Sequence, residues 1–379
     1  MDTGILGGVA DLTEADLKAM QQGQYILHAR RAELEKVPAD KVLLPRDPQG
    51  HPQAVNVATG PDGAIYVNQR TILCKSVDGG QTWSAWPRQA DIGAIQILSN
   101  GTLISGSGGD QAPIVFWASR DGGHVWEKVS AIELPRAYHT WGLYGLFRLP
   151  DDSLLASVQC SSAKFNGLDW ASGTVQLFAY HSDDLGKTWG SPSKVCDWGS
   201  EGGIARTASG RLLAVVRHQR PVLPTDPAGL IEITARHFKE ATGKLPPRVY
   251  KHVFLADSED NGRTWKNFRQ LTTVFGQCYG FPAALADGTV AVAHDTRYGP
   301  GVPSGRAMIS RDEGRTWQDE VYYLYYGEGG SGYNQSVVLN GRTILTIAGT
   351  TNYLPARQTW EAAIGRCDIT AIRWHPAAS

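Results

Sequence analysis

The chain has 379 residues, 42% of them hydrophobic, and it contains 43 glycines, 20 prolines and 12 tryptophans. This is enough apolar material for a large buried core, and the glycine, proline and tryptophan content is typical of many short strands joined by turns. The net charge of −1 lacks the marked basic excess that attracts nucleic acid or an anionic membrane surface, so we expect neither partner.

Five cysteines are scattered along the sequence without any C-x-x-C pair. Their odd number and spacing indicate reduced core residues and favour a cytoplasmic protein. The first residues contain no basic segment followed by an apolar stretch, so we expect no signal peptide. No His or Cys cluster has metal-ligand spacing, and we expect neither a metal nor another cofactor.

Residues 13–36 are predicted to form a helix or paired helical turns, because Thr13 can cap a helix and apolar residues such as Leu17 recur among charged ones. We therefore expect a short N-terminal helical extension over residues 1–50. It either packs on the rest of the protein or remains a solvated extension.

From residue 51 onward a strand pattern recurs: an apolar strand, a tight turn, a second strand, a variable loop, a third strand, another turn and a fourth strand. The first tight turn appears six times, as Asp62-Gly63, Asn100-Gly101, Asp151-Asp152, Ser209-Gly210, Asp287-Gly288 and Asn340-Gly341. Six four-stranded units are predicted, at 51–88, 89–132, 133–197, 198–273, 274–326 and 327–375. In the last unit a third strand at 359–364 is followed by a degenerate turn at 365–368.

The second turn is an eight-residue phrase, S-x-D-x-G-x-T-W, present in five copies. The copies span 76–83, 119–126, 182–189, 258–265 and 310–317, and only the second departs from the pattern, with Val125 in place of Thr. A short Asp can accept hydrogen bonds from turn amides, Gly permits positive φ, and Trp packs as the next strand begins. A repeated turn implies a repeated sheet.

This phrase is similar to the Asp-box, or BNR, repeat, and over residues 51 to 375 the chain resembles the sialidase-like superfamily. The resemblance implies an all-β, six-bladed β-propeller with four-stranded antiparallel blades, formed by residues 51–379. Because the boxes are structural and one fold hosts many functions, no box residue is a candidate for the site.

Strand direction predicts where a site lies. Both kinds of turn, after the first and after the third strand, lie on one face of the disc. Starts of first strands and ends of second strands therefore meet on the opposite face, near the axis, and form what we call the mouth.

At the mouth of blade four, Glu201 begins the first strand and Arg217 ends the second. The spacing is similar to that of an acid and an arginine in sialidases, and Tyr333, at the start of blade six, resembles their nucleophilic tyrosine. A tyrosine needs a carboxylate to remove its proton, and Glu201 is placed to do so. The structural alternatives are a rim salt bridge for Glu201 and Arg217, and a core or sugar-stacking role for Tyr333.

Blades three and five offer further candidates. In blade five, Arg297 could hold a substrate carboxylate together with Arg217, and Arg306 is the competing choice. The same strand carries His294, and blade three begins with His139, a potential proton donor. Aromatic residues that could stack on sugar rings accompany His139 in blade three, namely Trp141 and Tyr144.

Two positions depart from the sialidase pattern. The arginine at the start of blade one is replaced by a segment that contains His51 and Gln53, and these two become candidates for substrate binding there. The short hairpin after strand two of blade one also leaves no catalytic aspartate there. Asp91 and Asp110 are substitutes by position alone.

We therefore expect a sialidase-like, exo-acting glycoside hydrolase whose carbohydrate substrate, an acidic or a neutral sugar, binds at the mouth; the two departures leave open whether this sugar is sialic acid. The alternatives are a lyase of uronate polymers that uses His and Tyr, and a non-catalytic propeller that binds carbohydrate or protein. Long insertions at 220–247 and 164–173 are predicted to flank the mouth, the first as a lid or an oligomer contact. An oligomer contact at 220–247 would make the protein a homo-oligomer.

Overall fold

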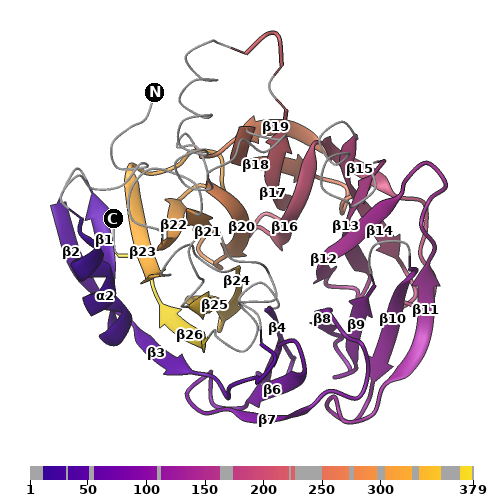
Figure 1. Cartoon of the computed structure of the whole chain (residues 1–379), viewed down its shortest axis with the longest axis horizontal. Coiled ribbons are helices and arrows are strands. Elements are labelled where there is room, and N and C mark those ends of the chain that lie inside the picture. Colours follow the sequence, from indigo (N-terminus) through magenta and orange to yellow (C-terminus); the bar gives the residue numbers. More distant parts are fainter. Residues whose placement is uncertain are drawn as a thin grey trace.

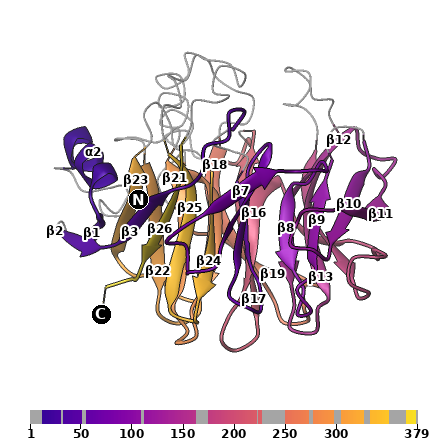
Figure 2. The same cartoon turned by 90° about the horizontal axis from the view of Figure 1, so that it is seen from below.

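The computed structural model describes residues 12–30, 33–50, 55–108, 112–162, 174–221, 223–226, 250–272, 277–296, 304–326, 333–350 and 368–377. In this part of the chain six antiparallel sheets stand around a common axis, as Figure 1 shows. Seen from the side in Figure 2, their strands run along that axis. The predicted six-bladed propeller is confirmed.

Each blade is a meander whose first strand is innermost. Blade one consists of β4 (Asn56–Thr59), β5 (Ile65–Asn68), β6 (Ile72–Ser76) and β7 (Ser84–Pro87). Blade two consists of β8 (Ala94–Ile97), β9 (Leu103–Ser107), β10 (Ile114–Ser119) and β11 (Glu127–Ile132). Blade three consists of β12 (Thr140–Arg148), β13 (Leu154–Ser161), β14 (Val175–Ser182) and β15 (Ser193–Asp197).

The other three blades follow the same order along the chain. Blade four consists of β16 (Gly199–Arg206), β17 (Leu212–Arg220), β18 (Tyr250–Ser258) and β19 (Lys266–Gln270). Blade five contains β20 (Gln277–Ala284), β21 (Val290–Thr296), β22 (Ser304–Ser310) and β23 (Glu320–Tyr326). Blade six contains β24 (Asn334–Leu339), β25 (Thr343–Thr350) and β26 (Asp368–Trp374).

The repeated phrase forms the turn after the third strand, as predicted. In the first copy Asp78 Oδ1 accepts hydrogen bonds from the amides of Gln81 and Thr82, both at 2.9 Å, and Oδ2 accepts the Thr82 hydroxyl at 2.6 Å. These hydrogen bonds, led by that of the Thr82 side chain, hold the pKa of Asp78 well below its usual value. The tight turns between first and second strands contain residues at positive φ, as expected, for example Gly210 at φ 94° in blade four and Asp152 at φ 66° in blade three.

The hydrophobic core is divided among the six gaps between neighbouring blades. Leu213 and Val215 of blade four, for example, pack with Val290 and Val292 of blade five. Equivalent buried clusters fill the gaps from blade five to six, six to one, one to two, two to three and three to four. Because every blade buries both of its faces, the ring holds the inner strands at fixed distances from the axis.

The N-terminal helix is shorter than predicted. Helix α2 spans Glu14–Gln22 and is capped by Thr13, but a helix from residue 23 to 36 is wrong, since these residues form β1 (Tyr25–Arg30) and β2 (Glu33–Pro38). Strand β1 pairs with β23, so blade five has six strands, and α2 packs on β1 and β23. In the part of the chain that the structure describes, no helix is long and apolar enough to cross a membrane.

Blade six differs from the prediction in its outer strands. Its third strand is β26, which pairs with β25. The prediction that the strand after the degenerate turn at 365–368 is the fourth strand of this blade is therefore wrong. The fourth strand is β3 (Asp40–Leu43), which pairs with β26 and is held by an ion pair between Asp40 and Arg373 at 2.5 Å. The segment 359–364, predicted as the third strand, lies outside the described residues.

Candidate functional site

Three of the predicted site residues meet at the mouth. Glu201 lies on β16, Arg217 lies on β17, and Tyr333 directly precedes β24. All three side chains belong to residues that are less than a tenth exposed, at 8%, 6% and 9%. The ring of blades therefore brings the carboxylate and the guanidinium of blade four and the phenol of blade six to one buried place.

The contacts among them form a closed triangle. The Tyr333 hydroxyl donates to Glu201 Oε1 at 2.5 Å. Arg217 Nη1 donates to Glu201 Oε2 and, at 3.3 Å, to the Tyr333 oxygen. The Glu201 carboxyl group thus accepts a hydrogen bond from the phenol on one oxygen and from the guanidinium on the other.

Local backbone structure explains the direction of Glu201. A bulge between Gly199 and Gly202 interrupts the pairing of β16 with β17, and Glu201 sits inside it. A Cβ on Gly202 would lie 1.9 Å from the Val215 carbonyl oxygen, so only glycine allows the two strands to approach here. The glycines after Glu201 are thus part of how its side chain reaches the mouth.

Tyr279 lies against Tyr333 and was not predicted from the sequence. Their rings are parallel within 8°, with centroids 4.1 Å apart. The sequence did contain a signal: Tyr279 precedes the tight turn of blade five by the same number of residues by which Glu201 precedes that of blade four. Both therefore occupy the same place at the mouth, and both lie within a bulge of their inner strand.

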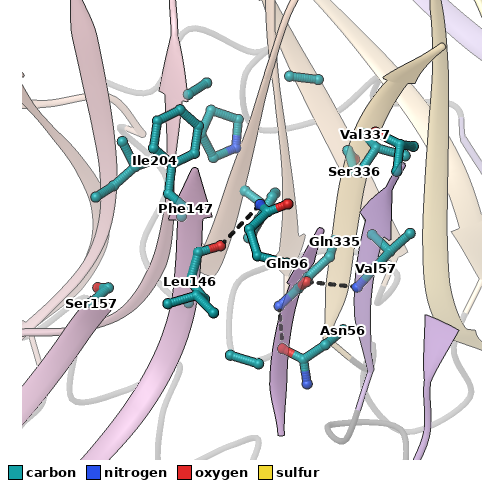
Figure 3. A pocket seen from close by; sticks show the side chains of 18 of the residues that line it. Asn56, Val57, Gln96, Leu146, Phe147, Ser157, Ile204, Gln335, Ser336 and Val337 are labelled. Atoms are coloured by element: carbon teal, nitrogen blue, oxygen red, sulfur yellow. Dashed lines mark hydrogen bonds between the residues drawn. The ribbon is translucent and has the colours of Figure 1, made fainter. Parts of the chain in front are cut away.

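A cavity of about 240 Å³ runs along the axis next to the site. It is lined by the inner strands of all six blades, with Gln96 and Gln335 among the polar side chains in Figure 3. Gln335 Nε2 donates to Asn56 Oδ1 at 2.9 Å, and its Oε1 accepts the Val57 amide at 3.1 Å. Gln335 also contacts the Tyr279 hydroxyl, so it stands between this cavity and the Tyr333 site.

His294 and Arg306 lie inside blade five. His294 is 1% exposed, and burial together with the charge of Arg306 lowers its pKa to about 3. Arg306 is 2% exposed, donates from Nε to the Ser304 hydroxyl at 3.1 Å, and sits 5.1 Å from the centre of the Tyr323 ring. A neutral, buried imidazole at this place is a poor proton donor in the range where proteins work.

The blade-three candidates have different environments. His139 is exposed and lies just before β12. Trp141 belongs to the cluster between blades two and three, and its indole nitrogen donates to the Ala112 carbonyl at 2.7 Å. Tyr144 is half-buried. Only His139 and Tyr144 thus keep substantial exposed surface.

Asp91 is exposed and lies 3.6 Å from Arg88. The other candidates, His51, Gln53, Asp110 and Arg297, lie outside the described residues, as do 163–173 and most of 220–247. Within the described ranges no three His, Cys, Asp or Glu side chains could hold a metal ion.

Solved structures share this fold at low sequence identity. A protein of unknown function from Dyadobacter fermentans is 16% identical, with 92% of this chain and 99% of that chain covered and a TM-score of 0.62. An α-L-arabinofuranosidase from Fusarium graminearum, in complex with an iminosugar inhibitor, is 16% identical, with 93% and 98% covered and a TM-score of 0.60. A Hadza microbial sialidase is 15% identical, with 85% and 65% covered and a TM-score of 0.56.

No family model matches the sequence, and no curated protein matches it. The chain is therefore a six-bladed propeller of the kind that sialidases and arabinofuranosidases also adopt.

Proposed function

We propose that this protein is a glycoside hydrolase that cleaves a sugar bound at the mouth, with Tyr333 as the nucleophile and Glu201 as its base. The observation that supports this most directly is the 2.5 Å hydrogen bond from the Tyr333 hydroxyl to Glu201 Oε1. A phenol attacks an anomeric carbon poorly until a carboxylate takes its proton. The buried position of the pair removes competing water.

The first step forms a bond between the Tyr333 oxygen and the anomeric carbon and breaks the glycosidic C–O bond. Glu201 receives the phenolic proton, and the leaving oxygen takes a proton from an acid. Arg217, 3.3 Å from the Tyr333 oxygen, stabilises negative charge as it develops there. His139 and Asp110 remain our candidates for the acid.

In the second step water attacks the same carbon, gives a proton to the group that acted as the acid in the first step, and releases the sugar from the Tyr333 oxygen. Glu201 returns its proton to the departing Tyr333 oxygen, so the triangle is regenerated. Two displacements at one carbon retain the anomeric configuration. Proton NMR of the first-formed sugar anomer tests this directly.

The substrate is a terminal sugar, and the comparisons suggest which to try first. We propose screening 4-nitrophenyl α-L-arabinofuranoside and 4-nitrophenyl α-sialoside, since similar folds carry these two activities at 15–16% identity. Release of nitrophenol from either supports the proposal. Binding of sugars without product from any glycoside would instead indicate a binding module, and an unsaturated, ultraviolet-absorbing product from uronate polymers would indicate a lyase.

The Tyr333→Phe variant removes only the proposed nucleophilic oxygen and is expected to lower kcat/KM at least about 1000-fold. Tyr322→Phe is its matched control, because Tyr322 is also buried and its oxygen accepts a hydrogen bond, from the Ala377 amide, outside the site. Equal activity of Tyr333→Phe and the control would refute the nucleophile.

Glu201→Gln is expected to lower kcat about 100- to 10,000-fold, since it removes the general base. It also leaves the Arg217 charge without its carboxylate, so unfolding must be measured in parallel. The double variant Glu201→Gln/Arg217→Met removes both charges and separates the loss of chemistry from a loss of folding.

A further inference from the structure

Tyr279 occupies an unusual place for a fully packed side chain. It is 2% exposed and lies flat against the ring of Tyr333, at a centroid distance of 4.1 Å. The hydroxyl group of the same Tyr333 ring donates to Glu201. A face-to-face contact restricts rotation of the Tyr333 ring about its χ2 bond, because turning the ring would drive its edge into Tyr279.

Tyr279 is itself held at both ends. Its backbone amide donates to Asp295 Oδ1 at 2.8 Å. Its hydroxyl accepts a hydrogen bond from Gln335 Nε2 at 3.4 Å, and Gln335 is in turn fixed by Asn56 and the Val57 amide of blade one. Tyr279, Gln335 and Asn56 therefore link blades five, six and one by hydrogen bonds next to Tyr333.

Tyr279 keeps its proton more firmly than an ordinary tyrosine does. Burial is the main cause that raises the pKa of Tyr279 far above its usual value, and the charges of Glu201 and Asp295 raise it further against the hydrogen bond from Gln335. The two stacked phenols, Tyr279 and Tyr333, thus make different hydrogen bonds. One oxygen is available to Glu201, and the other remains a hydrogen-bond acceptor for an amide.

We propose that Tyr279 is a positioning residue, whose stacked ring keeps the Tyr333 oxygen against Glu201. The inference rests on the proposed function, since it assigns Tyr279 a part in the same reaction. The ring performs this task, whereas the hydroxyl group of Tyr279 serves only to anchor it.

Two substitutions separate the ring from the hydroxyl. Tyr279→Leu removes the flat surface, and we expect kcat to fall about 100-fold with KM nearly unchanged, because misplacement by about an ångström costs that much in rate. Tyr279→Phe keeps the ring and loses only the contact with Gln335, so kcat is expected within about tenfold of wild type. Rescue by phenylalanine distinguishes positioning from a need for the phenol.

Tyr325→Phe is the matched control. Tyr325 is fully buried in β23, and its oxygen accepts a hydrogen bond at 3.3 Å from Asn334, the residue next to Tyr333. Loss of a buried phenol oxygen near the site is therefore common to Tyr325→Phe and Tyr279→Phe. If both leave kcat high while Tyr279→Leu lowers it, the stack is responsible.

Crystal structures of the variants provide a measurement that needs no activity. In Tyr279→Phe the distance from the Tyr333 oxygen to Glu201 Oε1 is expected to stay near the 2.5 Å of the wild type. In Tyr279→Leu the ring is expected to turn and the hydrogen bond to break. An intact hydrogen bond in Tyr279→Leu, or an equal loss of kcat in Tyr279→Phe and Tyr279→Leu, would overturn the inference.

The two measurements also separate this inference from the proposed function. If the wild type cleaves no glycoside but the Tyr333 ring turns only in Tyr279→Leu, the function fails and the positioning contact stands. If the wild type is active and Tyr279→Leu changes neither kcat nor the ring, the function stands and the inference fails.

Discussion

Mild acid should destabilise this protein through histidines that are buried without charge. His218, His252 and His294 are 7%, 2% and 1% exposed. Burial, as the largest cause for each, lowers their pKa values to about 3, about 4 and about 3. In the unfolded chain each would have a pKa of about 6.5.

The sign of the effect follows from proton binding. Between these folded and unfolded pKa values the unfolded chain binds more protons, so the stability that the neutral imidazoles contribute is present above pH 6.5 and is lost as the pH falls. For one such histidine the free energy of unfolding falls by about 2 kcal/mol between pH 7 and pH 5, and for three it falls by about 6 kcal/mol. Losses of this size are a large part of a typical folding free energy.

His218→Phe isolates one of the three contributions. The imidazole lies 4.5 Å from the ring of Phe254 and 5.4 Å from that of Phe268, and its Nδ1 has no hydrogen-bond partner in the described structure. The apolar ring of phenylalanine should therefore fit at this position. In His218→Phe the free energy of unfolding should fall by about 2 kcal/mol less between pH 7 and pH 5 than in the wild type.

Urea unfolding at pH 7 and pH 5 measures this difference, with His124→Gln as a control at an exposed site. The control is expected to lose as much stability on acidification as the wild type. If His218→Phe also loses as much as the wild type, the buried neutral imidazole is not what makes the protein acid-sensitive.

Two further predictions concern the turns and the N-terminal strands. In the second box Val125 is exposed and has no hydroxyl to donate to Asp121, whereas in the fourth box Thr264 Oγ1 donates to Asp260 at 2.6 Å. Val125→Thr should therefore raise the free energy of unfolding by about 0.5–1.5 kcal/mol and Thr264→Val should lower it by as much; an unchanged urea midpoint in both variants would contradict this. Although burial lowers the pKa of His28, its 2.8 Å hydrogen bond to Glu320 and a second carboxylate contact raise it overall. The stability that His28 contributes is thus present below pH 6.5 and is lost as the pH rises through the pKa of His28 in the folded protein. Between pH 6 and pH 9 the free energy of unfolding of His28→Asn should therefore fall by less than that of the wild type, and an identical fall would exclude this role.

Much of the fold could be predicted because its information is local. The box aspartate bonds to residues within four positions of itself, and the tight turns between first and second strands need particular residues at positive φ. Counting such turns gives the number of blades and the face on which each strand ends. That direction was enough to bring Glu201, Arg217 and Tyr333 together, although they come from two blades that are far apart in sequence.

The N-terminal region could not be predicted in the same way, because its strands pair with partners some 300 residues away. The segment after Gln22 is charged and lacks a turn phrase, so its local pattern favours a helix, whereas pairing of β1 with β23 decides the structure. Tyr279 was missed for a related reason. Its distance from the tight turn of blade five places Tyr279 at the mouth, but that spacing does not reveal the contact with the ring of Tyr333, which depends on how blades five and six pack.

The pairing of β3 with β26 sets an order for synthesis on the ribosome. Asp40 emerges 333 residues before Arg373, so the strand that completes blade six leaves the exit tunnel long before its partner is translated. Until then β3 is an unpaired edge, and β1 likewise waits for β23. The nascent chain can assemble its middle blades first, and the circle becomes complete only after β26 has been made. We therefore expect closure of the ring to be the slowest step of folding and the one most exposed to aggregation.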